Sequence, residues 1–216
     1  MDKLVIFDCD GTLIDSEIIA ARVFPTVWSS MGLQMTSDFF LCNFVGTGFN
    51  AEIVKQTMAQ LPSNAVEIAE KKFEEEMANY LEPVKGIRQI LEWLPHQACV
   101  ASNSSLNYIK KALVKSRLDH FFADRVYSSR EFGNPKPAPD IFLHAAKESG
   151  ALPENCIVIE DSVSGIKGAQ NAGMTVIGLM AGQHFNQVVK DRLLSAKANF
   201  YCSSAEELKE VIQNLF

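Results

Sequence analysis

Four acidic side chains follow two short apolar runs of the chain, in an arrangement that would suit a divalent cation. Asp8 and Asp10 come directly after the first run, and Glu160 and Asp161 come directly after a later one. If both runs are strands of one parallel sheet, the four carboxylates meet beyond its carboxyl edge, where such sheets bind ligands. Crowded carboxylates repel one another unless a cation neutralises them, and Mg²⁺ takes few carboxylates and leaves room for a phosphate. We therefore expect a magnesium site, although any one acid after a strand also suits a turn or a helix cap.

Two further groups could hold an anion at the same edge. Ser102 and Asn103 follow another apolar run and precede a helix, so hydroxyl, amide and helix N-terminal N–H groups could bind a phosphate together. The same pair would also make an ordinary helix cap. Lys136 lies between Pro135 and Pro137, which restrict its backbone and bias it away from a helix. A lysine fixed in this way is better explained as a positioned charge for phosphate than as a free surface side chain.

The apolar runs that precede these residues are continuous rather than alternating. Continuous runs rich in Val and Ile are typical of strands that helices cover on both faces in a parallel sheet. The expected strands are residues 4–7, 98–101, 125–128, 156–159, 175–179 and 199–202. Segments of helical length lie between or beside them, at residues 87–94, 107–117, 139–149, 163–171, 186–195 and 205–215. This alternation predicts an α/β fold with a doubly wound, Rossmann-like parallel sheet.

One long segment breaks the alternation. Residues 16–81 contain no convincing buried strand and show only the apolar spacing of helices. The segment is too long to be a simple crossover between two strands. We therefore expect a helical cap at residues 16–83, inserted into an α/β core that consists of residues 1–15 and 84–216. Such a cap would act as a lid over the carboxyl edge of the sheet, with hinges where the chain enters and leaves it.

Composition and charge narrow the class of protein. The chain has 216 residues, a formal net charge of −6 and 47% hydrophobic residues, which suits a folded core and excludes a disordered chain. The negative charge argues against nucleic acid as the main partner, because phosphate backbones need a basic surface. No apolar run reaches the ~18 residues that span a bilayer, and the first run is too short for a signal peptide. We expect a cytoplasmic monomer that binds a small phosphorylated metabolite and neither nucleic acid nor a membrane.

Cysteine and histidine indicate no further chemistry. The five cysteines are odd in number and none pairs in a CxxC spacing, so we interpret them as reduced structural thiols. The four histidines share no ligand spacing, so we interpret them as structural or surface residues and expect no zinc site. They are His96, His120, His144 and His184. A nucleophile elbow, a Walker loop and a GxGxxG turn after a strand are all absent from the sequence.

Four segments together resemble the sequence motifs of the haloacid dehalogenase-like hydrolase superfamily. They are FDCDGTLIDSE, VASNS, NPKPAPDIF and VIEDSVSGIKGAQNAGM, in the order and spacing of the family. The resemblance covers nearly the whole chain and is strongest to the β-phosphoglucomutase-like group, whose helical cap follows the first strand. It implies that Asp8 is a nucleophile that forms an aspartyl-phosphate. It also implies that Asp10 is the general acid and then the general base, and that Ser102 and Lys136 hold the phosphoryl oxygens.

The resemblance also implies a metal site and a cap contact. Asp8, the backbone carbonyl of Asp10 and Asp161 would bind Mg²⁺, with Glu160 in or just outside that shell. In the cap, the glycines of the segment FVGTGFN would let its backbone approach the substrate. We therefore expect Gly46 and Thr47 to contact the substrate.

The expected reaction is hydrolysis of a small phosphomonoester, such as a sugar phosphate or a phosphorylated sugar acid like 6-phosphogluconate. A phosphosugar mutase is the first alternative. Mutases of this group usually carry a His and an Arg in the cap, but SEIIAARVF contains no His and FVGTGFN contains no Arg. The second alternative is a receiver-like signalling module with a phosphorylatable Asp, but such modules have no helical insertion.

Overall fold

The computed structural model describes residues 3–46 and 52–215. These residues contain one six-stranded sheet with the strand order β3-β2-β1-β4-β5-β6, and all of its neighbouring strands are parallel. The strands are β1 Leu4–Phe7, β2 Gln97–Ser102, β3 Val126–Ser128, β4 Cys156–Glu160, β5 Thr175–Leu179 and β6 Phe200–Cys202. This order is that of a doubly wound dinucleotide-binding-type sheet, and it confirms the predicted α/β fold.

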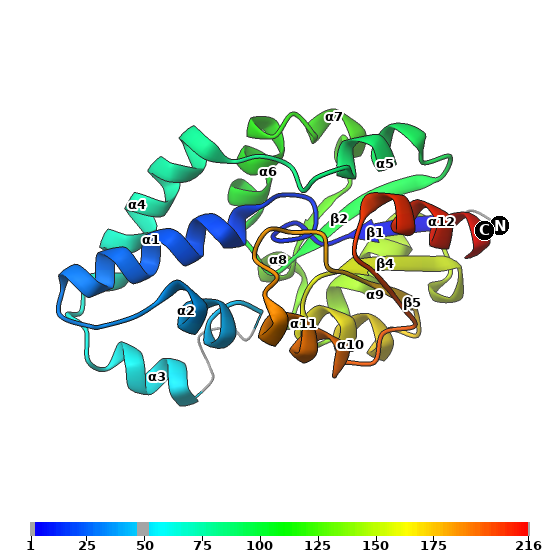
Figure 1. Cartoon of the computed structure of the whole chain (residues 1–216). Coiled ribbons are helices and arrows are strands. Elements are labelled where there is room, and N and C mark those ends of the chain that lie inside the picture. Colours follow the sequence, from blue (N-terminus) through cyan, green and yellow to red (C-terminus); the bar gives the residue numbers. More distant parts are fainter. Residues whose placement is uncertain (1–2, 47–51, 216) are drawn as a thin grey trace.

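Helices cover both faces of the sheet (Figure 1). Alternate side chains of the buried strands point to opposite faces, so each face has its own apolar core. One face packs against α5 Ile87–Trp93, α6 Leu106–Lys115, α7 Asp119–Phe122 and α12 Ala205–Leu215. The other face packs against α9 Asp140–Glu148, α10 Val163–Asn171 and α11 Gln187–Leu194, while α8 Ser129–Phe132 and a 3₁₀ turn at Pro153–Asn155 lie in the connections.

The expected helical segment forms a separate group of helices beside the sheet (Figure 1). Its described helices are α1 Ser16–Ser30, α2 Ser37–Asn43, α3 Glu52–Met58 and α4 Ala65–Tyr80. They have an apolar core of their own, in which Phe24, Trp28 and Phe40 are buried and in mutual aromatic contact. The Trp28 indole also donates a hydrogen bond to the carbonyl of Ala65 at 3.1 Å, which ties α1 to the start of α4.

The chain enters and leaves this helical group along two adjacent segments. The backbone N–H of Asp15 donates to the carbonyl of Glu82 at 3.0 Å, and that of Val84 donates to the carbonyl of Leu13 at 3.0 Å. Both segments therefore reach the sheet at one place, next to the carboxyl end of β1. No helix in the part of the chain that the structure describes is long and apolar enough to cross a membrane.

Candidate active site

Four side chains from three separate segments meet at the carboxyl edge of the central strands. Asp8 follows β1, Glu160 ends β4, Asp161 follows it, and Lys136 comes from the loop between α8 and α9. The Lys136 ammonium group lies 2.6 Å from Asp8 Oδ1 and 2.6 Å from Glu160 Oε1, and it donates to the carbonyl of Ala101 at 2.7 Å. All four side chains are buried, so this charged group is shielded from bulk water.

Asn103 holds the lysine loop against the sheet. Its side-chain oxygen accepts a hydrogen bond of 2.9 Å from the backbone N–H of Lys136, and its amide donates to the Lys136 carbonyl at 3.4 Å. The side chain of Asn103 is thus engaged by the lysine backbone, and its contact with the substrate stays a prediction. Ser102 lies next to it, buried at the end of β2, and its hydroxyl accepts a hydrogen bond of 3.1 Å from the backbone N–H of Ser104.

Burial and crowding shift the pKa values of the charged groups. Burial raises the pKa of Asp8 well above its usual range, and repulsion from Glu160 and Asp161 adds to this effect, while Lys136 opposes it. Burial also raises the pKa of Glu160, again against the attraction of Lys136. For Lys136, burial alone would lower the pKa, but its two carboxylate partners outweigh burial and raise it. The lysine therefore remains charged at neutral pH and neutralises part of the acidic cluster.

Three carboxylates form a group that could hold a metal ion. Asp8, Glu160 and Asp161 each offer one oxygen, and these oxygens all lie within 4.8 Å of one another. The backbone leaves room for them, because a Cβ at Gly165 would collide with the carboxyl of Glu160 and one at Gly11 would collide with Asp161. Oxygen ligands with an excess of negative charge fit a hard divalent cation.

Asp10 lies apart from this group and faces a different set of partners. Its carboxylate accepts three hydrogen bonds of 2.7 Å, from the hydroxyls of Ser16, Ser104 and Tyr108. Ser16 opens helix α1, Ser104 precedes helix α6 and Tyr108 lies in its first turn. Of the two predicted catalytic acids, Asp8 therefore lies with the possible metal ligands, and Asp10 lies between the starts of cap helix α1 and core helix α6. The three hydroxyl donors are contacts that the sequence analysis missed, because no motif signals them.

A cleft of about 450 Å³ opens between the sheet edge and the helices α1, α2 and α4. Its polar lining residues are Asp10, Ser16, Glu17, Glu70, Glu74, Ser104, Ser105, Tyr108 and Arg130, and several phenylalanines complete it. Burial beside Asp10 raises the pKa of Glu17 to about 8. Arg130 is the one basic side chain among the residues that line this cleft. The cleft therefore offers aromatic surface, hydrogen-bonding carboxylates and one cation next to Asp10.

The predicted substrate contact Gly46 lies where the cap meets the core, and its contact with the substrate stays a prediction. Gly46 has a positive φ of 68°, and a Cβ there would lie 3.4 Å from the Cβ of Ser162 at the start of α10. Arg192 of α11 donates to the carbonyls of Cys42 and Val45 at 2.6 and 2.7 Å, which holds this end of α2 against the core. Gly46 is not among the residues that line the cleft. Thr47 lies outside the described residues.

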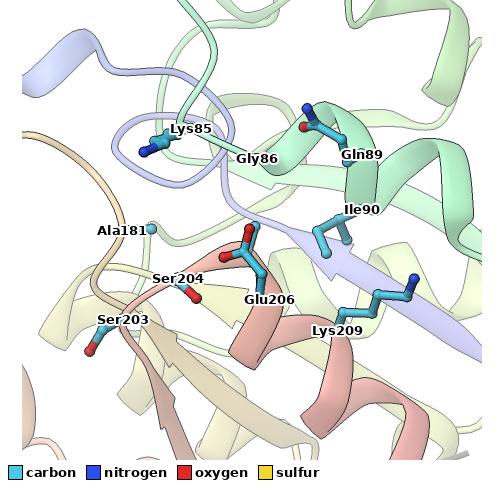
Figure 2. A pocket seen from close by; sticks show the side chains of 10 residues that line it. Lys85, Gly86, Gln89, Ile90, Ala181, Ser203, Ser204, Glu206 and Lys209 are labelled. Atoms are coloured by element: carbon cyan, nitrogen blue, oxygen red, sulfur yellow. The ribbon is translucent and has the colours of Figure 1, made fainter.

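A second hollow, of about 510 Å³, lies beside the start of α12 (Figure 2). Lys85, Gly86, Ser203, Glu206 and Lys209 are among the residues that line it, on the segment that leads into α5 and on the start of α12. None of the acidic cluster around Asp8 lines this hollow. It is therefore separate from the candidate active site.

The fold and the site together define an α/β protein with paired acids and a lysine at the carboxyl edge of a parallel sheet. Residues 5–179 match the haloacid dehalogenase-like hydrolase family, so the chain belongs to this family. The predicted resemblance is thereby confirmed.

Characterised relatives refine this assignment. The chain is 31% identical to a 6-phosphogluconate phosphatase of Escherichia coli K12, over 88% of both chains. It is 30% identical to a fructose-1-phosphate phosphatase of the same organism, over 80% of this chain and 94% of the relative. A haloacid dehalogenase-like protein of Agrobacterium tumefaciens has a similar structure, with a TM-score of 0.91 and 34% identity over 100% and 99% of the two chains. The protein is therefore a phosphoric monoester hydrolase.

Proposed function

We propose that the protein is an Mg²⁺-dependent phosphatase that hydrolyses a sugar phosphate or a phosphorylated sugar acid through an aspartyl-phosphate at Asp8. The observation that carries the proposal is the position of Asp8, 2.6 Å from the Lys136 ammonium group and within the cluster of carboxylates. A carboxylate nucleophile divides hydrolysis into two easier steps, and phosphoryl transfer needs charge neutralisation and positioning above all.

In the first step, an oxygen of Asp8 attacks phosphorus and the bond between phosphorus and the substrate alcohol breaks. Asp10 gives its proton to the leaving alcohol oxygen. In the second step, water attacks the phosphorus of the aspartyl-phosphate, Asp10 takes a proton from that water, and Asp8 leaves as a carboxylate with release of inorganic phosphate. Lys136 and Ser102 stabilise the charge on the phosphoryl oxygens throughout both steps.

The metal site of the proposal comprises Asp8, Asp161 and the backbone carbonyl of Asp10, with Glu160 beside them. The excess of buried carboxylate over the single Lys136 ammonium group supports a divalent cation here. When bound, Mg²⁺ would neutralise negative charge that develops on the phosphoryl group.

The cleft supports a small polar substrate. Glu17, Glu70 and Glu74 could accept hydrogen bonds from sugar hydroxyls, and Arg130 could bind the carboxylate of a sugar acid. The names of the two E. coli relatives point in the same direction. The residues that line the cleft include no histidine, which supports hydrolysis over the mutase alternative. Membership of a hydrolase family and the helical insertion count against the receiver-like alternative.

The proposal includes the organisation and setting of the protein. We divide the chain into a core of residues 1–15 and 84–216 and a cap of residues 16–83, which has its own apolar cluster. We place the enzyme in the cytoplasm as a monomer, in keeping with five cysteines that are all free.

The test is phosphate release from a panel that contains 6-phosphogluconate, fructose 1-phosphate, phosphoglycolate and nucleoside monophosphates. We expect release of phosphate with Mg²⁺, none after chelation with EDTA, and a decrease of at least ~10³-fold in Asp8→Asn. A substrate with labelled phosphate should leave acid-stable label on the wild-type protein after rapid quenching. Full turnover by Asp8→Asn would falsify the proposed nucleophile, since an amide is a poor nucleophile.

A further inference from the structure

A buried histidine lies directly behind the acidic cluster. His184 follows β5 in the chain, its side chain is 1% exposed, and its ring packs against Phe185 with centroids 4.2 Å apart. Neither ring nitrogen makes a hydrogen bond with any described residue. The Nε2 atom nevertheless lies at an ion-pair distance of 3.2 Å from Oδ2 of Asp161. Asp161 is thus the charged partner of this buried ring, and a pair of this kind beside the acidic cluster calls for a functional explanation.

The backbone is shaped to seat this ring beside Asp161. A Cβ at Gly182 would lie 2.7 Å from His184 Nδ1 and 3.0 Å from the carbonyl oxygen of Gly11. A Cβ at Gly11 would lie 3.0 Å from His184 Cε1 and would collide with Asp161. Gly11 also has a positive φ of 74°, which side chains other than glycine rarely adopt. Two glycines from separate loops thus make the space in which the imidazole and the carboxylate face each other.

The two oxygens of Asp161 have different neighbours. The buried hydroxyl of Thr12 donates a hydrogen bond of 3.1 Å to Oδ1, and the His184 ring faces Oδ2. A carboxylate held from two directions has a fixed orientation, which a metal ligand requires.

We propose that His184 is a positioning residue for Asp161, which it orients, together with Thr12, toward the cation bound by the acidic cluster. The proposal rests on the proposed function, because it assigns Asp161 to the metal site. His184 itself is not placed among the metal ligands. Residues that orient metal ligands in this way typically contribute about 10- to 100-fold to metal affinity. The histidine that the sequence suggested was structural or at the surface would thus determine how well the enzyme retains its metal.

The experiment measures metal binding in the absence of substrate. Mn²⁺ serves as the probe, with the free ion followed by electron paramagnetic resonance, and Mg²⁺ affinity is obtained by competition. His184→Phe keeps the ring volume but removes both nitrogens, and His184→Gln retains an N–H that can face Asp161. His144→Phe is the matched control, because His144 is a half-buried histidine that stacks on Phe132 at 3.7 Å.

We expect His184→Phe to weaken Mn²⁺ binding by about 10- to 100-fold, His184→Gln to recover most of this loss, and His144→Phe to bind as the wild type does. In phosphate release, His184→Phe should need more Mg²⁺ but show an unchanged KM for the phosphomonoester at saturating Mg²⁺. If His184→Phe does not fold, judged by its near-ultraviolet circular dichroism, His184→Met takes its place with the same expectation.

Two results would overturn the inference, and they differ in what else they affect. If the folded His184→Phe or His184→Met variant binds Mn²⁺ with an affinity within twofold of the wild type, His184 does not position the metal ligand. The proposed phosphatase activity would be unaffected by this result. A wild-type protein that binds no Mn²⁺ but releases phosphate in EDTA would overturn both this inference and the proposed cation.

Discussion

The ammonium group of Lys136 lies 2.6 Å from a carboxylate oxygen of Asp8, and both side chains are buried. The same ammonium group reaches Glu160 at 2.6 Å, so one lysine is the partner of two buried acids. Removal of one partner of a buried ion pair leaves an uncompensated charge in the interior. The free-energy cost of this unpaired charge is larger than the net stabilisation that the intact pair provides.

Lys136→Met should therefore affect both stability and catalysis. We expect the free energy of unfolding to fall by about 3 kcal/mol, measured by urea denaturation in EDTA. Phosphate release should fall by at least ~100-fold, because the charge on the phosphoryl oxygens loses its partner. Lys110→Met, at an exposed position of α6, is the control and should change neither quantity. Unchanged stability of Lys136→Met would contradict the lysine's role as a structural counter-ion.

Tyr108→Phe tests the hydrogen bond of 2.7 Å to Asp10. The variant keeps the aromatic stack on Phe73 but removes the hydroxyl that orients the proposed acid. We expect the rate of protein phosphorylation to fall about tenfold with a sugar phosphate, whose leaving alcohol needs a proton. With p-nitrophenyl phosphate the rate should fall less than twofold, since nitrophenolate leaves without one. Rapid-quench measurements give both rates, and equal losses would indicate a purely structural tyrosine. Tyr80→Phe, at an exposed tyrosine of α4, is the control.

Glu17→Gln tests the electrostatics of the cleft through the pH dependence of stability. The pKa of Glu17 is raised from 4.5 to about 8, so the folded state binds this proton more tightly than the unfolded state does. Stability is therefore lost as pH rises from about 4.5 through about 8. We expect Glu17→Gln to melt about 5 °C above the wild type at pH 9 in EDTA, and within about 2 °C of it at pH 4.5. The exposed Glu92→Gln is the control, and a pH-independent difference for Glu17→Gln would contradict the assignment.

Arg130→Gln tests which anion the cleft selects. If Arg130 binds the carboxylate of a sugar acid, the variant should raise the KM for 6-phosphogluconate at least about tenfold. The KM for fructose 1-phosphate, which has no carboxylate, should change less than twofold and serves as the internal control. Equal changes for both substrates would place Arg130 at the phosphate or in a structural role. Steady-state phosphate release provides both constants.

The sequence predicted the sheet well because buried parallel strands leave a strong local signal. The bounds of β1 and β5 and of helices α10 and α12 agree with the predicted ranges, and those of the other strands differ by one or two residues. The single-turn helices α7 and α8 were not predicted, since one turn is too short to show an apolar period. The approach of Asp8, Lys136 and Asp161 followed from the rule that ligands bind at the carboxyl edge of such sheets.

The parts of the site that sequence reasoning missed depend on the directions of side chains in loops. The side chain of Asn103 meets the backbone of Lys136, a contact that the sequence did not signal. Tyr108 reaches Asp10 from helix α6, and His184 reaches Asp161 only because Gly11 and Gly182 leave space. No periodic pattern in the sequence signals these contacts. Each contact joins residues that are far apart in the chain, and only the completed fold brings them together.

The central position of β1 has a consequence for the order in which the enzyme is built. Leu4 pairs with Gln97 on one side and with Cys156 on the other, so β1 is made before both of the strands that it pairs with. Contacts this distant in sequence close slowly, because the loop between them must be ordered first. Asp8 is made well before its acidic partners at the end of β4. A nascent chain that has not yet reached β4 thus carries the proposed nucleophile without the pocket, and the acidic cluster forms only after β4 has been made.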